Sequence, residues 1–136
     1  MTPLETIQNV YKAYGAGDIE GALSYCADDV CFRWVAEPEL MAYAGECNGK
    51  AAFLERLNAL HKDYEYHSFR PIEIIDGGDR LAAQVEMELT RRDNGKKFVL
   101  HAAEFWTVRN GAVTHMVEYY DTAKIAEMNK PVAVAA

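Results

Sequence analysis

Apolar residues recur at helical spacing in three segments of the first half of the chain. The sequence TPLE at residues 2–5 is a capping-box pattern, and apolar positions behind it repeat every three or four residues up to Gly15. Asp18 can cap a second, shorter helix that ends before residue 28. A third helix is expected from Gly49 onwards. Its buried side should carry Ala52, Phe53, Leu57 and Leu60.

The period changes to that of strands at residues 30–35 and again after the third helix. VCFRWV at 30–35 is rich in β-branched and aromatic residues, and an irregular stretch follows it up to Gly49. Four further strands, separated by the turns DGGD, DNG and NG, are expected at residues 66–75, 80–92, 96–109 and 112–120. Three helices followed by a long antiparallel meander predict an α+β domain whose helices cover one face of a curved sheet.

Length, composition and charge narrow the class of protein. The chain has 136 residues, 50% of them hydrophobic and 26% charged, as expected for one globular domain. We expect a single domain over residues 1–126 and a flexible tail over residues 127–136. A net charge of −7, with only two short basic pairs, argues against a nucleic-acid partner.

The chain also lacks the usual signals for membranes and disulfides. No apolar run approaches the roughly 20 residues of a membrane span, and the N-terminus lacks a basic segment followed by an apolar one. We therefore expect a soluble, cytoplasmic protein with no membrane partner. The three cysteines show no CxxC arrangement, and we interpret them as reduced packing residues.

The order of these elements, with AGDIEGALSYCADDV at 16–30 and VRNGAVTHMVEYYD at 108–121, resembles the SnoaL-like branch of the nuclear transport factor 2-like superfamily. The resemblance covers nearly the whole chain. It implies a cone-shaped barrel in which three N-terminal helices and the concave face of the sheet enclose an apolar pocket. The superfamily includes isomerases, cyclases, dehydratases, epoxide hydrolases and non-catalytic binding or transport proteins, so the motifs support the fold better than any one reaction.

The resemblance also indicates which side chains face the pocket. It places the strand face that contains Glu118 inside the cone, and by alternation the preceding strand sends Glu104 inward as well. The expected substrate-binding residues are Tyr14, Phe32, Trp34, Phe53, Val85, Met87, Ala102, Met116 and Tyr120.

Glu104 and Glu118 are the candidate catalytic residues. A carboxyl group with apolar walls loses hydration, which raises its pKa, and a second carboxyl nearby raises one pKa of the pair further. Such a pair can act as acid and base near neutral pH, with Glu118 as the base and Glu104 as the acid or oxyanion donor. The alternative is a structural role, in which each glutamate hydrogen-bonds a tyrosine or histidine, or the cavity is filled and wet.

The chain departs from two superfamily members of known mechanism. Ketosteroid isomerase is similar in plan, but its general base would fall at Trp34 and its helical tyrosine near Val10. Limonene epoxide hydrolase is also similar, and one of its carboxylates would fall at Glu118. Its arginine and second aspartate, however, would fall at Val85 and Met87. These departures argue against both reactions.

Two functions remain compatible with the sequence. The first is a cofactor-independent isomerase, cyclase or lyase acting on a small hydrophobic ring or carbonyl compound, like the polyketide cyclases that this branch resembles. The second is a non-catalytic ligand-binding or protein-interaction module of the same fold. An open pocket would favour the first, and a pocket plugged by Trp34, Met87 and Met116 the second. No metal is expected, because no regular element gathers His61 and His67 with the acids between them.

The outer face of the sheet is expected to be buried in a homodimer. It would carry Ala103, Phe105, Val113 and Val117, with His101 and His115 beside them. This face is too apolar for a sheet surface left in water, and similar proteins commonly bury it between two copies.

Overall fold

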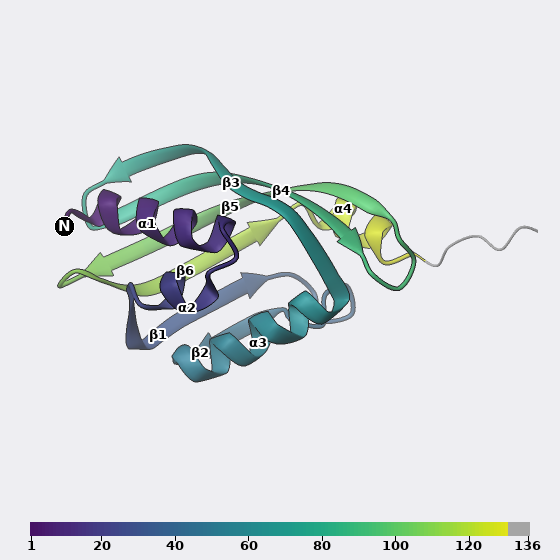
Figure 1. Cartoon of the computed structure of the whole chain (residues 1–136), viewed down its shortest axis with the longest axis horizontal. Helices are drawn as coiled ribbons and strands as arrows, with labels where there is room; N and C mark the ends of the chain where they lie inside the picture. Colours follow the sequence, from purple (N-terminus) through teal and green to yellow (C-terminus); the bar gives the residue numbers. More distant parts are fainter. Residues whose placement is uncertain (131–136) are drawn as a thin grey trace, which may run out of the picture.

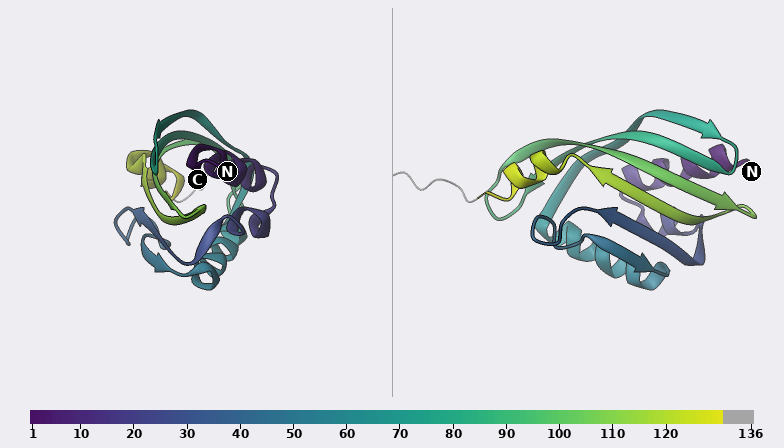
Figure 2. Two further views of the ribbon diagram at one scale, coloured as in Figure 1. Left: turned by 90° about the vertical axis from the view of Figure 1, so that its left-hand side faces the viewer. Right: turned by 180° about the vertical axis from the view of Figure 1, so that it is seen from behind.

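The structure is a computed structural model that describes residues 1–130. Its elements, in chain order, are α1 (Pro3–Gly15), α2 (Ile19–Leu23), β1 (Cys26–Val35), β2 (Gly45–Asn48), α3 (Lys50–Asp63), β3 (Tyr64–Gly77), β4 (Arg80–Arg91), β5 (Lys97–Arg109), β6 (Ala112–Tyr120) and α4 (Thr122–Met128). One six-stranded sheet has the order β2-β1-β6-β5-β4-β3. The sheet curls, and α1, α2 and α3 lie along its concave side, so that sheet and helices together form the expected cone (Figures 1 and 2).

Local sequence signals explain where the first helices begin. The Thr2 hydroxyl accepts a hydrogen bond from the Glu5 backbone N–H at 3.1 Å, and Pro3 occupies the first helical position. The Asp18 carboxylate accepts from the Gly21 N–H at 2.9 Å and caps α2. Both predicted caps are therefore confirmed.

The later strands lie close to their predicted positions, but other predictions need correction. Strand β1 begins at Cys26, before the predicted start, and its pairing with β6 is parallel, whereas every other pairing is antiparallel. Strand β2 was not predicted, because GECN has no strand signature and is extended by its pairing to β1. On α3, Ala52 is exposed rather than buried.

The sequence predicts a flexible tail from residue 127, but at that residue the chain is still in a helix packed on the domain. Residue 127 lies within α4, and the Met128 side chain is 2% exposed. Asn129 accepts from the Tyr64 hydroxyl at 3.0 Å and donates its Nδ2–H to the Leu40 carbonyl at 2.6 Å. Residues 127–130 are thus part of the packed domain. The rest of the expected tail, residues 131–136, lies outside the described residues.

The outer face of the sheet carries most of the apolar residues that the sequence predicts there, but not Val113. Phe105 and Tyr119 are 44% and 49% exposed and pack edge to face at 5.9 Å, and His101 and His115 are exposed beside them. Val113, however, is fully buried. The strand register shifts between Thr107 and Val108, and this irregularity turns Val113 inward.

The lengths of the helices and the state of the cysteines also bear on the predictions from sequence. No helix within residues 1–130 is long and apolar enough to cross a membrane. All three cysteines are free, and Cys26 and Cys47 are buried, as expected for packing residues.

Candidate functional site

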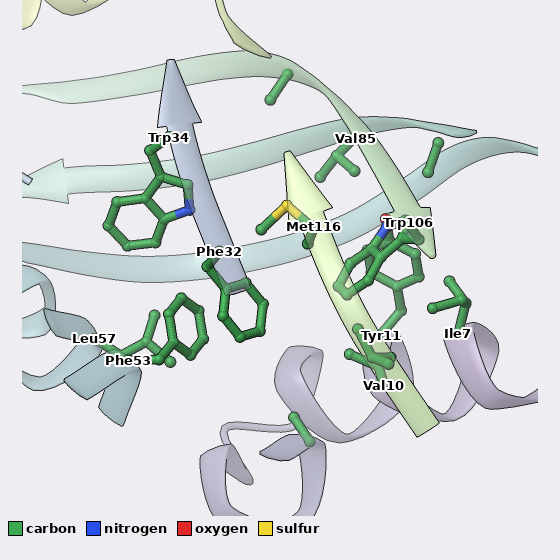
Figure 3. Packing of buried hydrophobic residues seen from close by; sticks show 14 of the residues in the cluster. Ile7, Val10, Tyr11, Phe32, Trp34, Phe53, Leu57, Val85, Trp106 and Met116 are labelled. Atoms are coloured by element: carbon green, nitrogen blue, oxygen red, sulfur yellow. Dashed lines mark hydrogen bonds between the residues drawn. The ribbon is translucent and has the colours of Figure 1, made fainter. Parts of the chain in front are cut away.

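A narrow cavity lies between the helices and the concave face of the sheet. Figure 3 shows Phe32, Trp34 and Phe53, three of the residues that line it. The volume of the cavity is about 60 Å³. Because a water needs about 10–15 Å³ measured in this way, the cavity has room for a few waters or one very small molecule. Aromatic rings form much of its wall. Phe32 and Phe53 stack at 3.6 Å, and Trp34 meets Phe53 edge-on at 5.9 Å.

Three neighbouring strands place one row of side chains across this cavity. Trp34 on β1 is in register with Glu118 on β6, and Glu118 is in register with Glu104 on β5. Residues directly opposite each other on an antiparallel pair have Cβ atoms about 5 Å apart, so the two carboxyl groups are neighbours. Both glutamates are only 3% exposed, as is Trp34.

Glu104 ends a buried chain of hydrogen bonds. The indole N–H of Trp106 donates to the Tyr11 hydroxyl at 2.8 Å, and that hydroxyl donates to Glu104 Oε1 at 2.6 Å. Tyr11 is 4% exposed and its ring meets Trp106 edge-on at 5.6 Å. Because the Tyr11 oxygen already accepts from Trp106, its own proton is directed at the carboxylate.

Glu118 is held from the other side by its own strand. The Tyr120 hydroxyl donates to Glu118 Oε1. Within residues 1–130, two buried side-chain nitrogen or oxygen atoms have no hydrogen-bond partner, Glu118 Oε2 and Trp34 Nε1. Both belong to residues that line the cavity. Each carboxyl group therefore has one tyrosine donor, and the two carboxyl groups also hydrogen-bond each other.

Comparison with known proteins places this cone and cavity in a family. Residues 7–116 match the profile of the SnoaL-like domain. The chain belongs to the SnoaL-like domain family. No curated protein sequence matches the chain.

Several solved structures have the same fold as this SnoaL-like domain. An NTF2-like protein from Burkholderia thailandensis has a TM-score of 0.88 at 22% identity, covering 96% of this chain and 99% of its own. TerC, co-crystallised with polyporic acid, has a TM-score of 0.80 at 27% identity, covering 93% and 96%. A protein from Mesorhizobium loti proposed to be a SnoaL-like polyketide cyclase has a TM-score of 0.74 at 25% identity, covering 88% and 100%.

Burial governs the protonation of the carboxyl pair in this SnoaL-like domain. Burial raises the pKa of Glu104, and the neighbouring donors Glu118 and Tyr11 oppose that rise. Burial also raises the pKa of Glu118 well above its ordinary value, and the nearby negative charge of Glu104 raises it further. On ionisation Glu104 therefore loses its proton first, and Glu118 keeps its proton to higher pH.

Most of the expected cavity residues do line the cavity. They are Tyr14, Phe32, Trp34, Phe53, Met87, Met116 and Tyr120, together with Glu104 and Glu118. Val85 and Ala102 do not, although both are buried on the predicted face. They share a row with Tyr120, and the longer tyrosine reaches the cavity whereas these short side chains stay in the packed core.

Tyr11 was not among the residues expected at the site. Its position on the apolar face of α1 fits a core role equally well, and only its contact with Glu104, 93 residues away, distinguishes it. Tyr14, one of the expected substrate-binding residues, lines the cavity, and its hydroxyl lies 3.2 Å from His61 Nε2. Burial lowers the pKa of His61, and the Arg92 charge lowers it further. The neutral imidazole can therefore accept the Tyr14 proton.

A larger hollow of about 590 Å³ adjoins the cavity at the α4 end of the cone. Leu60, Tyr66 and Tyr120 line both spaces. The segment around Tyr43 bounds the hollow, and the Tyr43 hydroxyl donates to Asp63 at the end of α3. Leu60, Tyr66 and Tyr120 therefore form the wall that the cavity and the hollow share.

The described residues contain no group of three or more potential ligands that could hold a metal ion. His61 and His67, at the ends of HKDYEYH, have different neighbours. His61 lies against Tyr14, and His67 Nε2 is 2.6 Å from the Thr90 hydroxyl on β4.

Proposed function

We propose that this SnoaL-like domain catalyses proton transfer on a small hydrophobic carbonyl compound, as part of an isomerisation, cyclisation or lyase reaction. The observation that carries the proposal is the pair of adjacent, buried carboxyl groups in an aromatic cavity. Similarity to a protein proposed to be a polyketide cyclase, and to TerC in its crystals with polyporic acid, supports chemistry on ring compounds. The two carboxyl groups can supply both acid and base, so the step requires no cofactor.

The hydrogen bonds favour the reverse of the roles expected from sequence. The Tyr11 proton stabilises Glu104 as a carboxylate, which suits a base. Glu118 keeps its proton to higher pH because its carboxyl is buried beside Glu104, which suits an acid. In the proposed step Glu104 removes a proton from the carbon next to a carbonyl, and Glu118 protonates or hydrogen-bonds the oxygen.

The proposal can be tested by deuterium exchange. Cyclohexanone is a small, uncharged ketone whose α-protons exchange slowly with solvent, so the protein should accelerate their replacement in D₂O, followed by proton NMR. The matched control is the double variant Glu104→Gln and Glu118→Gln. Cyclohexanone that binds in the cavity but exchanges no faster with the wild type than with the double variant would contradict a catalytic role.

A second candidate is a non-catalytic binding module, and the small cavity favours it. A volume of about 60 Å³ leaves little room for a substrate unless side chains such as Met87 and Met116 move. This candidate predicts that ligand binds without any acceleration of exchange, so the same measurement separates the two functions.

We also propose that two copies associate through the outer face of the sheet. Phe105 and Tyr119 form an exposed aromatic pair there, with Ala103 and Val117 beside them. Replacing Phe105→Glu should convert a dimer into a monomer in sedimentation-velocity experiments, because it places a charge in the apolar contact. The control Ala51→Glu puts the same charge on the exposed side of α3 and should leave the dimer intact. A wild-type protein that sediments as a monomer at micromolar concentration would rule the contact out.

A further inference from the structure

The carboxyl pair lies out of contact with bulk water, since Glu104 and Glu118 are each only 3% exposed. The proposed reaction leaves a proton from the substrate on Glu104. Exchange of that proton with solvent requires a path through the wall of the cavity. Titratable side chains that line the cavity and also contact a second, open space can provide such a path.

A surface pocket of about 230 Å³ adjoins the cavity where α1 and α3 end and β3 begins. Its lining includes the exposed residues Gly15, Glu65 and His67, so the pocket is open to solvent. The residues that line both this pocket and the inner cavity are Tyr14, Ile19, Tyr66 and Phe69. On this side, the cavity is therefore separated from solvent by the thickness of one side chain.

Tyr14 connects this shared wall to a histidine. Its hydroxyl lies 3.2 Å from Nε2 of His61 on α3, and His61 lines the surface pocket but not the cavity. The His61 carbonyl accepts from Arg92 Nε at 3.1 Å, and the His61 ring meets Tyr66 edge-on at 5.0 Å. One hydrogen bond thus joins a residue of the buried cavity to a half-buried imidazole in an open pocket.

His61 is suited to pass protons in either direction near neutral pH. Burial lowers its pKa, and the charge of Arg92, which has the Glu65 carboxylate 4.0 Å away, lowers it further. At neutral pH the imidazole is therefore uncharged, and an imidazolium formed there releases its proton readily. A neutral imidazole has one accepting and one donating nitrogen, so it can take a proton at Nε2 and give one from the other nitrogen.

Tyr14 is also close enough to the carboxyl pair to be affected by its charge. Burial raises the pKa of Tyr14, and the charges of Glu118 and Glu104 raise it further. All three residues line the same cavity of about 60 Å³, which has room for a few waters. In so small a space, water can hydrogen-bond a carboxyl group on one side and the Tyr14 hydroxyl on the other.

We propose that Tyr14 and His61 form a proton relay between the buried carboxyl pair and the surface pocket. This inference rests on the proposed function and adds the route by which the base exchanges its proton with solvent. Without such a route, Glu104 would return the same proton to the substrate, and no deuterium would be incorporated.

The relay moves one proton out and brings one deuteron in. A carboxyl O–H gives its proton to water in the cavity, that water gives a proton to the Tyr14 oxygen, and the Tyr14 O–H proton moves to His61 Nε2. The imidazolium then releases the proton of its other nitrogen to solvent in the pocket. The reverse passage carries a deuteron inward and restores the carboxyl group and the first tautomer, so a round trip leaves every group in its starting state.

The wall toward the larger hollow offers a competing exit. No histidine of residues 1–130 lines that hollow, and the hydroxyl of Tyr120, which does, donates to Glu118. Tyr66 lines the hollow as well as the cavity, so its hydroxyl is the alternative that the experiment must exclude.

Exchange of buried hydroxyl protons tests the relay without any substrate. The hydroxyls of Tyr11 and Tyr120 donate to Glu104 and Glu118, so their exchange with water measures how fast protons enter the carboxyl network. Labelling with ¹³Cζ-tyrosine resolves the hydroxyl signals in NMR spectra, and saturation transfer from water gives their lifetimes. His61→Gln should lengthen these lifetimes at least about tenfold, because the amide can accept from Tyr14 but cannot become a cation, and only slower local opening remains.

Two further variants separate the relay from a general change in packing. Tyr14→Phe should lengthen the lifetimes as much as His61→Gln does, because it removes the hydroxyl but keeps the ring that packs on Phe69 at 4.7 Å. His67→Gln is the matched control, since His67 lines the same pocket but lies 2.6 Å from the Thr90 hydroxyl, and should leave the lifetimes at their wild-type values.

Three results would overturn the relay. The first is a set of lifetimes in His61→Gln that are equal to or shorter than those of the wild type, including hydroxyl signals that exchange too fast to be seen in both. The second is slowing by His67→Gln as large as that by His61→Gln. The third is slowing by Tyr66→Phe but not by Tyr14→Phe, which would place the exit at the hollow.

Free imidazole provides a rescue experiment. His61→Ala removes the ring from the wall of the open pocket, where imidazole from solution can take its place. Imidazole should restore fast hydroxyl exchange in His61→Ala but not in the double variant His61→Ala and Tyr14→Phe, which lacks the inner half of the relay. Equal rescue of both variants would show that imidazole acts without Tyr14 and would contradict the proposed route.

Failure of the relay can be distinguished from failure of the proposed function. In His61→Gln, deuterium exchange into cyclohexanone should also fall about tenfold. Cyclohexanone exchange and hydroxyl lifetimes that both stay at wild-type values in His61→Gln would retain catalysis and remove the relay. Hydroxyl lifetimes that lengthen in His61→Gln, in a protein that exchanges no deuterium into cyclohexanone, would retain the relay and remove catalysis.

Discussion

Glu104→Gln is expected to lower the rate of deuterium exchange into cyclohexanone by at least about 100-fold, because positioned general bases typically contribute 10²–10⁴-fold. The amide has nearly the shape of the carboxylate and can still accept the Tyr11 proton at its oxygen, so the cavity should keep its form. What it loses is the ability to take a proton from carbon. Exchange should be measured at a fixed neutral pH and at saturating ketone, so that the change is seen in kcat.

Glu88→Gln is the matched control for this variant. Glu88 is exposed on β4 and belongs to neither the cavity nor the hydrogen-bond chain, so exchange should remain at the wild-type rate. Far-UV circular dichroism of both variants should match the wild type. If Glu104→Gln retained full exchange activity while Glu118→Gln lost it, Glu118 would be the base, as the sequence predicts.

The buried pair should also make the protein less stable as the pH rises. The pKa of Glu118 is raised in the folded state, so the folded protein holds this proton more tightly than the unfolded chain does. Unfolding therefore releases a proton between the ordinary glutamic acid pKa of 4.5 and the raised one. In that window the free energy of unfolding should fall by roughly 1 kcal/mol per pH unit, and the stabilising contribution is fully present only below the ordinary pKa.

Urea unfolding at a series of pH values from about 5 to about 8 measures this slope. The Glu118→Gln variant should lose most of the decline, because its amide does not titrate and no longer opposes ionisation of Glu104. Glu88→Gln should parallel the wild type. A wild-type slope equal to that of Glu118→Gln would show that the Glu118 pKa is not raised, and the acid role proposed for it would fail.

The path of the chain was largely predictable from local patterns. Caps at Thr2 and Asp18 gave the starts of α1 and α2, and alternation of apolar residues gave the inward faces of β4 and β5. These predictions succeed because a cap or a face depends on a few neighbouring residues. The sequence did not predict the start of β1, strand β2 or helix α4, because their local signals are weak. Pairing with neighbouring strands holds the start of β1 and all of β2 in extended form, and the residue after α4, Asn129, is held by Tyr64.

The candidate site was only partly predictable for the same reason. Alternation indicated that Glu104 and Glu118 both face inward, but it did not show that they stand opposite each other, because this depends on the register of β5 and β6. Val113 shows the limit of alternation, since one irregularity in register reversed its face. Tyr11 could not be distinguished from a core residue until the fold brought α1 against β5.

The sequence by itself therefore determined the fold, the inward faces and the presence of two carboxyl groups in an apolar interior, because these follow from periodicity and composition. The tertiary structure decided which tyrosine stabilises which glutamate, which carboxyl keeps its proton, and that Trp34 stands beside Glu118 with its N–H unpartnered within residues 1–130. Those properties depend on distances of a few ångströms between residues far apart in the chain, and such distances are set only when the strands pair and the helices pack.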